Sequence, residues 1–575
     1  MNKANTLFWT IILSIVVVYG YFIHRVAVNL PISDDYDLIR VKYVFLTENL
    51  TWWQRLRELL QPENDHRILI PRSVALLNYQ IEGFINYRSL IAVVNVSLLG
   101  LMALWGSSLR KVKLPIGHLI PILLCYLSAF TFDVTLWGIN GMQHTTLNLL
   151  VFTSLYLAAV ATSMRGHLLA LVLAWAATFT NGNGFLVFPS AIVFLALVRR
   201  WPQVAIWCVG MAGALLAYFL DYRFGQATKV AWSGEFLQNL IVSLGALSGG
   251  WVAAFKGATW LPVLWGAAIV GFGILGWLMF WFCQKWWKTQ PHTPPMVLFW
   301  IGIFLFSVFT IGIIAISRGG TDVYSIFTSR YSLYPLHLLT LAYIALLLSL
   351  PQHPKALGTG SLIFSILFWL MSYYNYAPSI DLRRRNLIAD DFNWRQHHQL
   401  TMSFRSWLAD FFSLPAYEKR VFKLNDFKLV EGEKYIIAPF DSTQKRISIP
   451  LTLSTTTDSI DFFNHPQIVH KFSLGNTTLP QPELGRNEGV YLVLKSPQNR
   501  TYLLPTWPKQ GGRKQFFTTG KVYKAGFDLT LYNENFKPDT YQIGVLQPQN
   551  QSFTLQYTPY RLKIDSTHVQ LLTKR

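Results

Sequence analysis

Ionisable side chains of both signs gather in the first polar stretch of the chain, directly after the first long apolar run. Ser33-Asp34-Asp35-Tyr36-Asp37 opens this stretch, and Glu63-Asn64-Asp65-His66-Arg67 follows further along, with Arg72 close behind. A carboxylate can take the proton of an attacking hydroxyl group, and an arginine can hold phosphate oxygens in a bidentate way. Charged groups are costly to keep at a membrane boundary, so the cluster predicts a functional site.

The composition restricts the class of protein. Of 575 residues, 52% are hydrophobic and 15% aromatic, and the mean hydropathy is +0.31, which is too apolar for an ordinary soluble domain. The formal net charge is +20, and much of the excess flanks the apolar runs. Cytosolic anchoring and anionic lipid head groups account for this charge without nucleic acid as a partner. The three cysteines, Cys125, Cys208 and Cys283, offer no disulfide framework.

The apolar runs predict a polytopic α-helical membrane protein with about eleven spans. The basic residues between the runs favour a cytoplasmic N-terminus and a C-terminal domain on the opposite side. The first apolar run has no small-residue cleavage site after it, which favours an uncleaved first span. The Gly- and Ser-rich segment 236–254 is interpreted as re-entrant or interfacial, because counting it as a span would invert the topology after it. The expected spans are residues 7–28, 88–108, 114–132, 142–163, 167–180, 184–198, 203–220, 259–283, 296–316, 332–350 and 357–376.

The first outer loop, residues 29–87, contains two amphipathic patterns. Apolar residues recur at helical spacing over 52–60 and again over 74–85. Both patterns are typical of interfacial helices that lie on a membrane surface. Such helices would hold the segment from Glu63 to Arg72 at the level of lipid head groups.

Four further polar segments are expected on the same outer face, namely residues 137–144, 181–184, 221–235 and 317–331. Ser329-Arg330-Tyr331 begins an apolar run, and Arg318 ends the preceding one. Arg330 on the outer side opposes the usual topology rule, which argues for a function. Because a guanidinium binds phosphate oxygens in a bidentate way, Arg67, Arg72, Arg318 and Arg330 are the candidates for holding a phosphate, with His66 and Tyr331 as further donors. Weaker candidates for contact with a sugar or an acceptor are Glu63, Asp65, Trp137, Asn140, Gln143, His144, Asn181 and Asn183.

Each of these assignments has a structural alternative. Asp34 or Asp35 could cap a helix or pair with a nearby cation, Glu63 and Arg67 have the spacing of a helical ion pair, and Arg318 could extend its head group from a span end to water. The segment 137–144 is also compatible with an interfacial turn, and 181–184 with a tight turn between two spans.

The composition changes after the last apolar run. Residues 381–426 are predicted to form a helical linker, with Phe404, Trp407, Leu408 and Phe411 along one stripe. From residue 427 to 575 short alternating runs separated by Pro, Asn and Gly predict a β-sandwich. The preceding residues 1–380 are predicted to form the membrane domain.

The predicted plan of the chain consists of one membrane helix, a loop that opens with Asp34 and Asp35, two juxtamembrane helices, a bundle of spans and a trailing soluble domain. This plan resembles the GT-C superfamily of glycosyltransferases. The resemblance covers the plan of the first 380 residues; by motif it covers the acidic loop and, more loosely, the His66-Arg67 and Ser329-Arg330-Tyr331 elements. It implies an enzyme of the bacterial inner membrane that uses a polyprenyl-phosphate-linked sugar at the periplasmic face, with Asp34 or Asp35 as the catalytic base.

The expected acceptor is a glycan, a lipid or a protein, and a divalent cation such as Mg or Mn is compatible with the outer carboxylates. Two other functions are weighed against glycosyl transfer. A polymerase or ligase of lipid-linked oligosaccharides would use outer arginines and depend less on paired carboxylates. A transporter or flippase of lipid-linked sugars would favour ionisable residues near the membrane midplane and internal repeats, and the sequence shows no clear repeat.

Overall fold

The structure is a computed structural model of the whole chain. The residues that it describes are 3–64, 66–222, 233–256, 261–320, 322–398, 400–402, 413–423, 436–437, 447, 451–458, 467–474, 479, 489–532, 535–549, 552–565 and 568–573. Asp65 and the predicted stripe from Phe404 to Phe411 lie outside these ranges.

The chain forms two compact units. Unit 1 consists of Met1–Ile23, Val44–Ile81 and Ser89–Tyr376, and unit 2 consists of His24–Tyr43, Glu82–Arg88 and Ala377–Arg575. The first polar loop is therefore divided. Asp34 and Asp35 belong to unit 2, whereas His66, Arg67 and Arg72 belong to unit 1.

Long apolar helices make up most of unit 1, because a backbone in a bilayer must satisfy its own hydrogen bonds. The helices that lie wholly or largely in unit 1 are α1 (Lys3–Val26), α3 (Trp52–Leu60), α4 (Leu69–Glu82), α5 (Tyr87–Lys111), α6 (Leu119–Tyr126), α7 (Phe132–Thr135), α8 (Gly138–Gly141), α9 (Leu147–Val160), α10 (Met164–Thr178), α11 (Val187–Leu197), α12 (Trp201–Phe219), α13 (Gly234–Ser248), α14 (Ala253–Lys256), α15 (Leu261–Thr289), α16 (Pro295–Ile314) and α17 (Leu333–Ser349). The last long helix, α18 (Pro354–His397), begins in unit 1.

These helices support a multi-pass membrane protein. Among the described residues, seven helices are long and apolar enough to cross a membrane, or up to nine if two bent pairs each count as one span. One bent pair joins α13 to α14 at 67°, in the segment predicted to be re-entrant or interfacial. The shorter helices α10 and α11 do not reach the length of a span, so the predicted count of about eleven stays a prediction.

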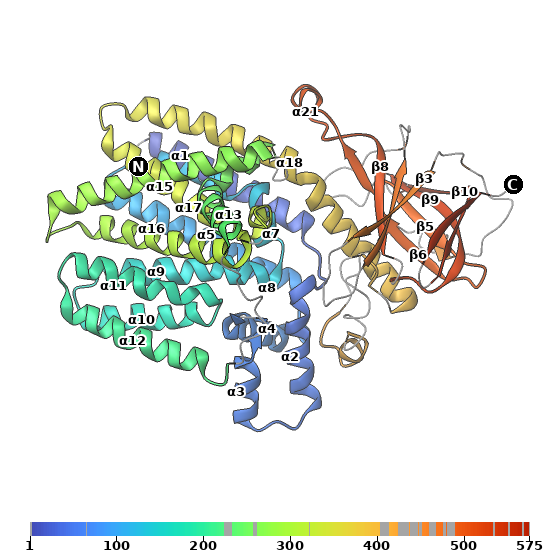
Figure 1. The fold of residues 1–575 in the computed structure, drawn as a ribbon, viewed down its shortest axis with the longest axis horizontal. Coiled ribbons are helices and arrows are strands. Elements are labelled where there is room, and N and C mark those ends of the chain that lie inside the picture. The colour runs from blue at the N-terminus through green and yellow to red at the C-terminus, as the bar shows by residue number, and fades with distance from the viewer. Residues whose placement is uncertain are drawn as a thin grey trace. The chain divides into compact units, whose positions relative to one another are not determined.

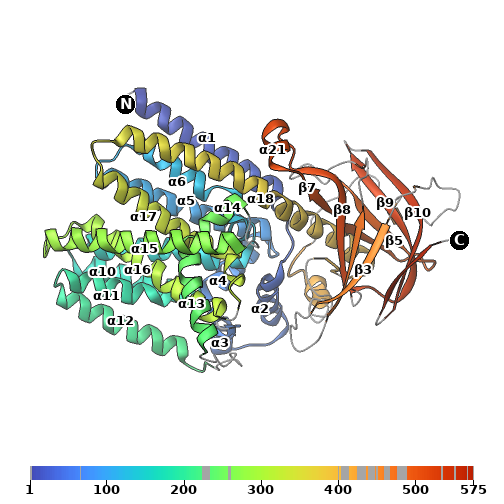
Figure 2. The same cartoon turned by 45° about the horizontal axis from the view of Figure 1, so that its top comes forward.

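The core of unit 1 lies around α16. This helix is apolar on all sides, which is typical of a helix buried inside a bundle, and it packs against α9, α11 and α17. Helices α10, α11, α12 and α16 run side by side in both Figure 1 and Figure 2. Both amphipathic segments of the first loop are helical, as α3 and α4, and their Trp52, Trp53 and Ile81 side chains are exposed.

Short irregular turns stand at the ends of several unit 1 helices. Two are π-helical, η4 (Met142–Thr146) before α9 and η7 (Ala315–Gly319) after α16. Two others are 3-10 helical, η5 (Gly182–Leu186) before α11 and η9 (Ser329–Tyr331) before α17. Single π turns are frequent at functional sites, and these four turns contain or adjoin most of the polar segments predicted on the outer face.

Unit 2 contains an antiparallel β-sheet region, as expected for the C-terminal part of the chain. One sheet has the strand order β11-β10-β9-β5-β6, and the other has the order β3-β4-β8-β7. Side chains of both sheets share one hydrophobic core, in which Leu492 of β5 and Leu529 of β8 are buried. The strands are β3 (Leu451–Asp458), β4 (Gln467–Leu474), β5 (Tyr491–Lys495), β6 (Thr501–Pro505), β7 (Trp507–Gln510), β8 (Tyr523–Tyr532), β9 (Asp539–Gln549), β10 (Ser552–Ile564) and β11 (Val569–Thr573).

The second half of α18 is tied into unit 2 by buried charges. Arg385 forms a 2.9 Å ion pair with Asp381, and both side chains are fully buried. The same guanidinium donates to the Thr506 carbonyl, and Arg384 donates to the carbonyl of Val26. Arg384 and Arg385 thus have partners inside unit 2.

Candidate functional site

The acidic pair predicted as a catalytic base lies on a short 3-10 turn, η1 (Ser33–Asp35), in unit 2. The two carboxylates differ in environment. Asp35 is buried, and its Oδ2 accepts the backbone N–H of Ile32 at 3.1 Å, whereas Asp34 is half-buried and accepts the Ser33 hydroxyl at 3.3 Å. Asp35 therefore has a capping role of the kind that competes with catalysis, and Asp34 is the more accessible carboxylate.

The third acid of the loop, Asp37, has a structural role. Asp37 lies at the start of α2 (Tyr36–Thr47), is buried, and pairs with Arg40 at 3.0 Å. Tyr87 donates its hydroxyl to the backbone carbonyl of Asp35 at 3.1 Å, so the short segment 82–88 holds the acidic turn in place within unit 2.

Arg67 is held by backbone carbonyls of unit 1. It lies in β2 (His66–Arg67), which pairs with β1 (Pro62–Glu63) in a small hairpin. Its guanidinium donates to the carbonyls of Leu60, Tyr218 and Leu220. Burial lowers the pKa of this guanidinium, and the charge stays in place because the carbonyl oxygens surround it. The arrangement joins the hairpin to the end of α12.

Arg72 occupies a comparable position at the end of α3. The side chain is buried, and Nη1 donates to the carbonyls of Leu59 at 3.0 Å and Gln61 at 2.5 Å. The last carbonyls of a helix have no partner within the helix and carry partial negative charge, so a cation there stabilises it. Both arginines of the first loop thus have a local structural function. Their predicted phosphate-binding role stays a prediction.

The polar segments of unit 1 that are distant in sequence meet around Tyr334. Asn183 donates its Nδ2 to the Tyr334 hydroxyl at 2.9 Å, and Nδ1 of His144 lies 3.3 Å from the same oxygen. Oδ1 of Asn183 is buried and has no hydrogen-bond partner among the described residues. His66 approaches the same place, because a Cβ added at Gly182 would lie 2.6 Å from His66 Nδ1. The absence of a side chain at Gly182 permits this close approach of His66.

Arg330 and Tyr331 lie on the other side of His144. The rings of His144 and Tyr331 meet edge to face at 6.1 Å, and His144 lies within electrostatic range of both Arg330 and His66. The guanidinium of Arg330 lies over the ring of Trp137, 5.8 Å from its centre. One cluster therefore contains predicted candidates from four segments of the sequence, around 66, 137–144, 183 and 330–331.

The segment Thr328–Ser332, which we call the Arg330 turn, has an unusual set of polar groups. Arg330 is half-buried, and no described carboxylate pairs with it. The hydroxyls of Thr328 and Ser332 are buried and have no partner among the described residues. Ser329 anchors the turn, because its hydroxyl donates to the Phe130 carbonyl at 2.8 Å.

The groups of this turn are of the kinds that bind anions. A guanidinium and two hydroxyls can donate to the same oxyanion, and the turn leads into the N-terminal end of α17, where the helix dipole favours negative charge. A half-buried cation without a counter-charge is costly, which also favours an anionic ligand.

The other candidates lie elsewhere or have local roles. Asn140 donates to the Asp133 carbonyl, and Asn181 donates to the Gln143 carbonyl while it caps η5. Glu63 lies in the hairpin opposite His66, and Arg318 is exposed on η7. Asp65 lies outside the described residues.

Sequence reasoning missed Tyr334, Thr328 and Ser332. Tyr334 was counted among the apolar residues of the span 332–350, although it is the residue that His144 and Asn183 share. Thr328 and Ser332 directly flank Ser329-Arg330-Tyr331. Their position next to Arg330 is the signal in the sequence that could have identified them. No rule of spacing could have shown that their hydroxyls are without partners.

Within the described part of the chain, no group of three or more His, Cys, Asp or Glu side chains could hold a metal ion. Comparison of the chain with models of known families, with curated proteins and with solved structures found no match.

Proposed function

We propose that this protein is a membrane glycosyltransferase that moves a sugar from a polyprenyl-phosphate donor to a glycan, lipid or protein acceptor. The observation that carries the proposal is the Arg330 turn. It combines a guanidinium without a described carboxylate partner and two buried hydroxyls without partners, at the end of an apolar helix of a multi-pass membrane protein. A phosphate attached to a membrane lipid has the charge and the location that such a turn would bind.

In this proposal Arg330 holds the phosphate during and after cleavage of the bond to the sugar. Arginine suits this role because its charge persists at all relevant pH values and its planar fork binds two phosphate oxygens at once. Negative charge grows on the phosphate as the bond breaks, so donors fixed in advance lower the barrier. The hydroxyls of Thr328 and Ser332 supply two further donors.

The base would be Asp34. Transfer to a hydroxyl acceptor needs a group that takes the proton as the new bond to the anomeric carbon forms. Asp34 is the more accessible of the two carboxylates, while Asp35 is engaged with the backbone of its own turn. Asp34 belongs to unit 2, and the Arg330 turn belongs to unit 1.

The cluster around Tyr334 supports a sugar-binding role. His144, Asn183 and Tyr334 form a hydrogen-bonded group, and the Oδ1 atom of Asn183 has no described partner. A sugar hydroxyl could donate to that oxygen. Trp137 lies beneath Arg330 and orients it by a cation–π contact rather than serving as a free stacking surface.

Several finer features belong to the same proposal. They are membership of the GT-C superfamily, a bacterial inner-membrane location with a cytoplasmic N-terminus, and a β-sandwich on the periplasmic side. The two sheets with a shared core support the sandwich.

A polymerase or ligase of lipid-linked oligosaccharides is the second candidate. The proximity of His144 to Arg330 within unit 1 favours this second candidate, because these two residues could act in the reaction without the carboxylates of the acidic turn. A transfer assay separates the two. The protein is reconstituted into liposomes with a polyprenyl-phosphate-linked sugar, and product is measured for wild type, Arg330→Gln and Asp34→Asn. Glycosyl transfer with an aspartate base predicts that both variants lose activity; a ligase predicts loss in Arg330→Gln alone.

A further inference from the structure

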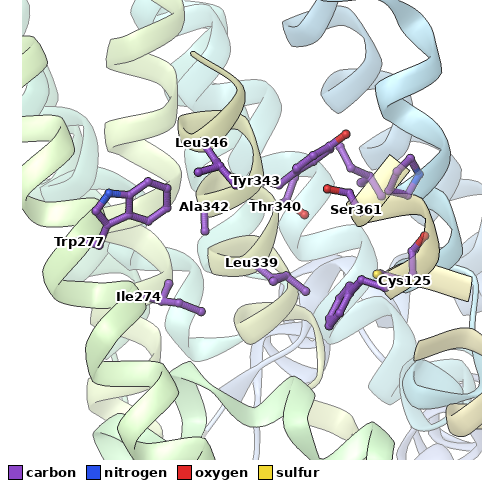
Figure 3. Close-up of a pocket in the computed structure, with 14 residues that line it drawn as sticks. Cys125, Ile274, Trp277, Leu339, Thr340, Ala342, Tyr343, Leu346 and Ser361 are labelled. Carbon is purple, nitrogen blue, oxygen red and sulfur yellow. The ribbon is translucent and has the colours of Figure 1, made fainter. Parts of the chain in front are cut away.

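Exposed apolar surface in unit 1 is expected of a membrane protein. The cavity of about 490 Å³ between α6, α15, α17 and α18 (Figure 3) is an example, because Ile274, Trp277 and Leu346 line it and none of the described residues around it is charged. Lipid tails are as apolar as leucine, so membrane helices can leave such surfaces to the surrounding lipid. Exposed apolar side chains in the β-sheet region of unit 2 need a different explanation.

The most exposed large hydrophobic side chain in the described part of unit 2 is Phe517, at 56%. It lies on α21 (Arg513–Thr519), in the connection between β7 and β8. These two strands are antiparallel neighbours, with Gln510 opposite Tyr523, so α21 stands at the tip of a hairpin. We call residues 511–524 the α21 finger. Figure 1 and Figure 2 both show α21 projecting from the sheets of unit 2.

The α21 finger has a defined structure, although it buries none of its helix. The N–H of Gly511 donates to the Val522 carbonyl at 2.7 Å, and Nε2 of Gln515 donates to the Tyr523 carbonyl at 3.0 Å. These bonds close the base of the finger and hold its helix to the following strand. No residue of α21 is buried in the described structure. The fold thus presents the Phe517 ring to its surroundings instead of packing it.

The charges of the α21 finger are all of one sign. Its basic residues Arg513, Lys514, Lys521 and Lys524 are exposed, and the sequence contains no Asp or Glu between residues 489 and 527. Arg513 and Lys514 are four and three residues before Phe517, so they lie beside it on the helix surface. An exposed aromatic ring flanked by cations is typical of segments that lie on anionic membrane surfaces.

The chain itself keeps a bilayer close to unit 2. The first helix, α1, ends at Val26, and unit 2 begins at His24; α18 passes from unit 1 into unit 2 after Tyr376 as one continuous helix. Both helices are long and apolar enough to cross a membrane. Unit 2 is therefore tethered to the membrane at two points, which gives a lipid surface a high effective concentration that a soluble partner lacks.

We propose that the α21 finger binds the surface of a bilayer that contains anionic phospholipids. Its lysines and Arg513 lie against the phosphate groups of the lipids, and the Phe517 ring enters the boundary between head groups and acyl chains. Long basic side chains suit this position, because their apolar stems can lie along the lipid while the charge stays at the head groups. The proposal does not depend on the proposed function.

The test is a fluorescence measurement on the full-length protein in lipid nanodiscs. An NBD fluorophore is attached at Phe517→Cys after the exposed Cys208 and Cys283 are replaced by serine; Cys125 is buried. The discs contain phosphatidylcholine alone or mixed with phosphatidylglycerol, and a nitroxide carried by the lipid quenches NBD that reaches the bilayer. The control label is placed at Tyr532→Cys, an exposed position at the other end of β8, about 30 Å along the strand.

The expected result is at least twofold stronger quenching of the finger label in discs with phosphatidylglycerol than in discs without it, and equal quenching of the control label in both. Replacement of Lys514, Lys521 and Lys524 together by glutamine should remove the difference. The matched control replaces Arg561 and Lys563, exposed cations of β10 in the other sheet, and should preserve it. Equal quenching of the finger label in the two kinds of disc, or a difference that survives the loss of the three lysines, would overturn the proposal.

Phe517→Ser separates entry into the bilayer from attraction of charge alone, because it keeps every cation of the finger. The label is then placed at the exposed neighbour, as Thr518→Cys. Quenching at this position in phosphatidylglycerol discs should fall at least twofold when Phe517 is replaced, and unchanged quenching would overturn the role of the ring. A response of the label to a soluble acidic polysaccharide, with none to anionic lipid, would assign the finger to a soluble partner and overturn the proposal.

Discussion

The guanidinium of Arg330 lies over the ring of Trp137, 5.8 Å from the ring centre, and no carboxylate in the described part of the chain pairs with it. A cation–π contact positions the charge without neutralising it. The two neighbouring hydroxyls of Thr328 and Ser332 are likewise without partners among the described residues. This combination distinguishes Arg330 from Arg67 and Arg72, whose donors bind backbone carbonyls.

Replacement of Arg330 should abolish transfer without unfolding the protein. Loss of a charged hydrogen-bonding group from a desolvated site costs several kcal/mol, so Arg330→Gln should reduce the rate of product formation by about 100-fold or more. Arg330→Lys should recover only part of it, because an ammonium lacks the bidentate fork. The exposed Arg318 is the control, and Arg318→Gln should stay within a fewfold of wild type. Equal losses in both arginines would contradict a special role for Arg330.

Substitution of the two aspartates of η1 should have different effects, one mainly on activity and the other mainly on stability. Asp34→Asn removes the accessible carboxylate and should eliminate transfer while the thermal unfolding midpoint stays unchanged. Asp35→Asn alters an oxygen that accepts the Ile32 N–H, so it should cost about 1 kcal/mol of stability with a smaller effect on turnover per folded molecule. Activity assays and thermal melts of the same samples decide this. Full transfer by both variants would exclude the acidic turn from catalysis.

Arg72→Met should destabilise unit 1 rather than impair chemistry directly. It removes the hydrogen bonds that the guanidinium donates to the carbonyls of Leu59 and Gln61, and a hydrogen bond to a charged group contributes about 1.5–3 kcal/mol. Arg57→Met is the matched control, because the pair of Arg57 with Asp221 is exposed on both sides and such pairs contribute about 0–1 kcal/mol. Chemical denaturation in detergent measures the difference. An Arg72→Met protein as stable as wild type but inactive would point to a direct role for Arg72.

The β-sheet region should gain stability as pH rises above 8. Lys495 is buried in β5 and donates to the carbonyls of Ile436 and Ile437, and burial lowers its pKa to about 8. The unfolded chain keeps a lysine pKa near 10.4, so between these values it binds more protons than the folded chain, and the free energy of unfolding rises with pH.

The check is the pH dependence of the unfolding midpoint, compared between wild type and Lys495→Met from pH 7.5 to 10. The wild-type midpoint should rise relative to the variant across this interval. A constant difference between the two proteins would show that Lys495 has an ordinary pKa in the folded state.

Much of the fold follows from patterns in the sequence. The long apolar runs, the two helices of the first loop and the change to strands after the last span all rest on periodicity, which one sequence displays. The division of the first loop between two units does not follow from periodicity. It depends on contacts such as that of Tyr87 with Asp35, between residues far apart in the chain.

The site was predictable in its residue types but not in its partners. Arg67, Arg72 and Arg330 look alike in the sequence, since each is an arginine near an expected outer face. Only the structure shows that the first two donate to backbone carbonyls and that the third has no described acid. The sequence pattern does not identify Tyr334 as a site residue, because a tyrosine in an apolar run is indistinguishable from an interfacial anchor.

The most direct measurement is a cryo-electron microscopy map of the full-length protein with a polyprenyl phosphate bound. The account predicts phosphate density within hydrogen-bond distance of the Arg330 guanidinium and of the Thr328 or Ser332 hydroxyl. Phosphate density at any other place, with these three side chains unengaged, would contradict it.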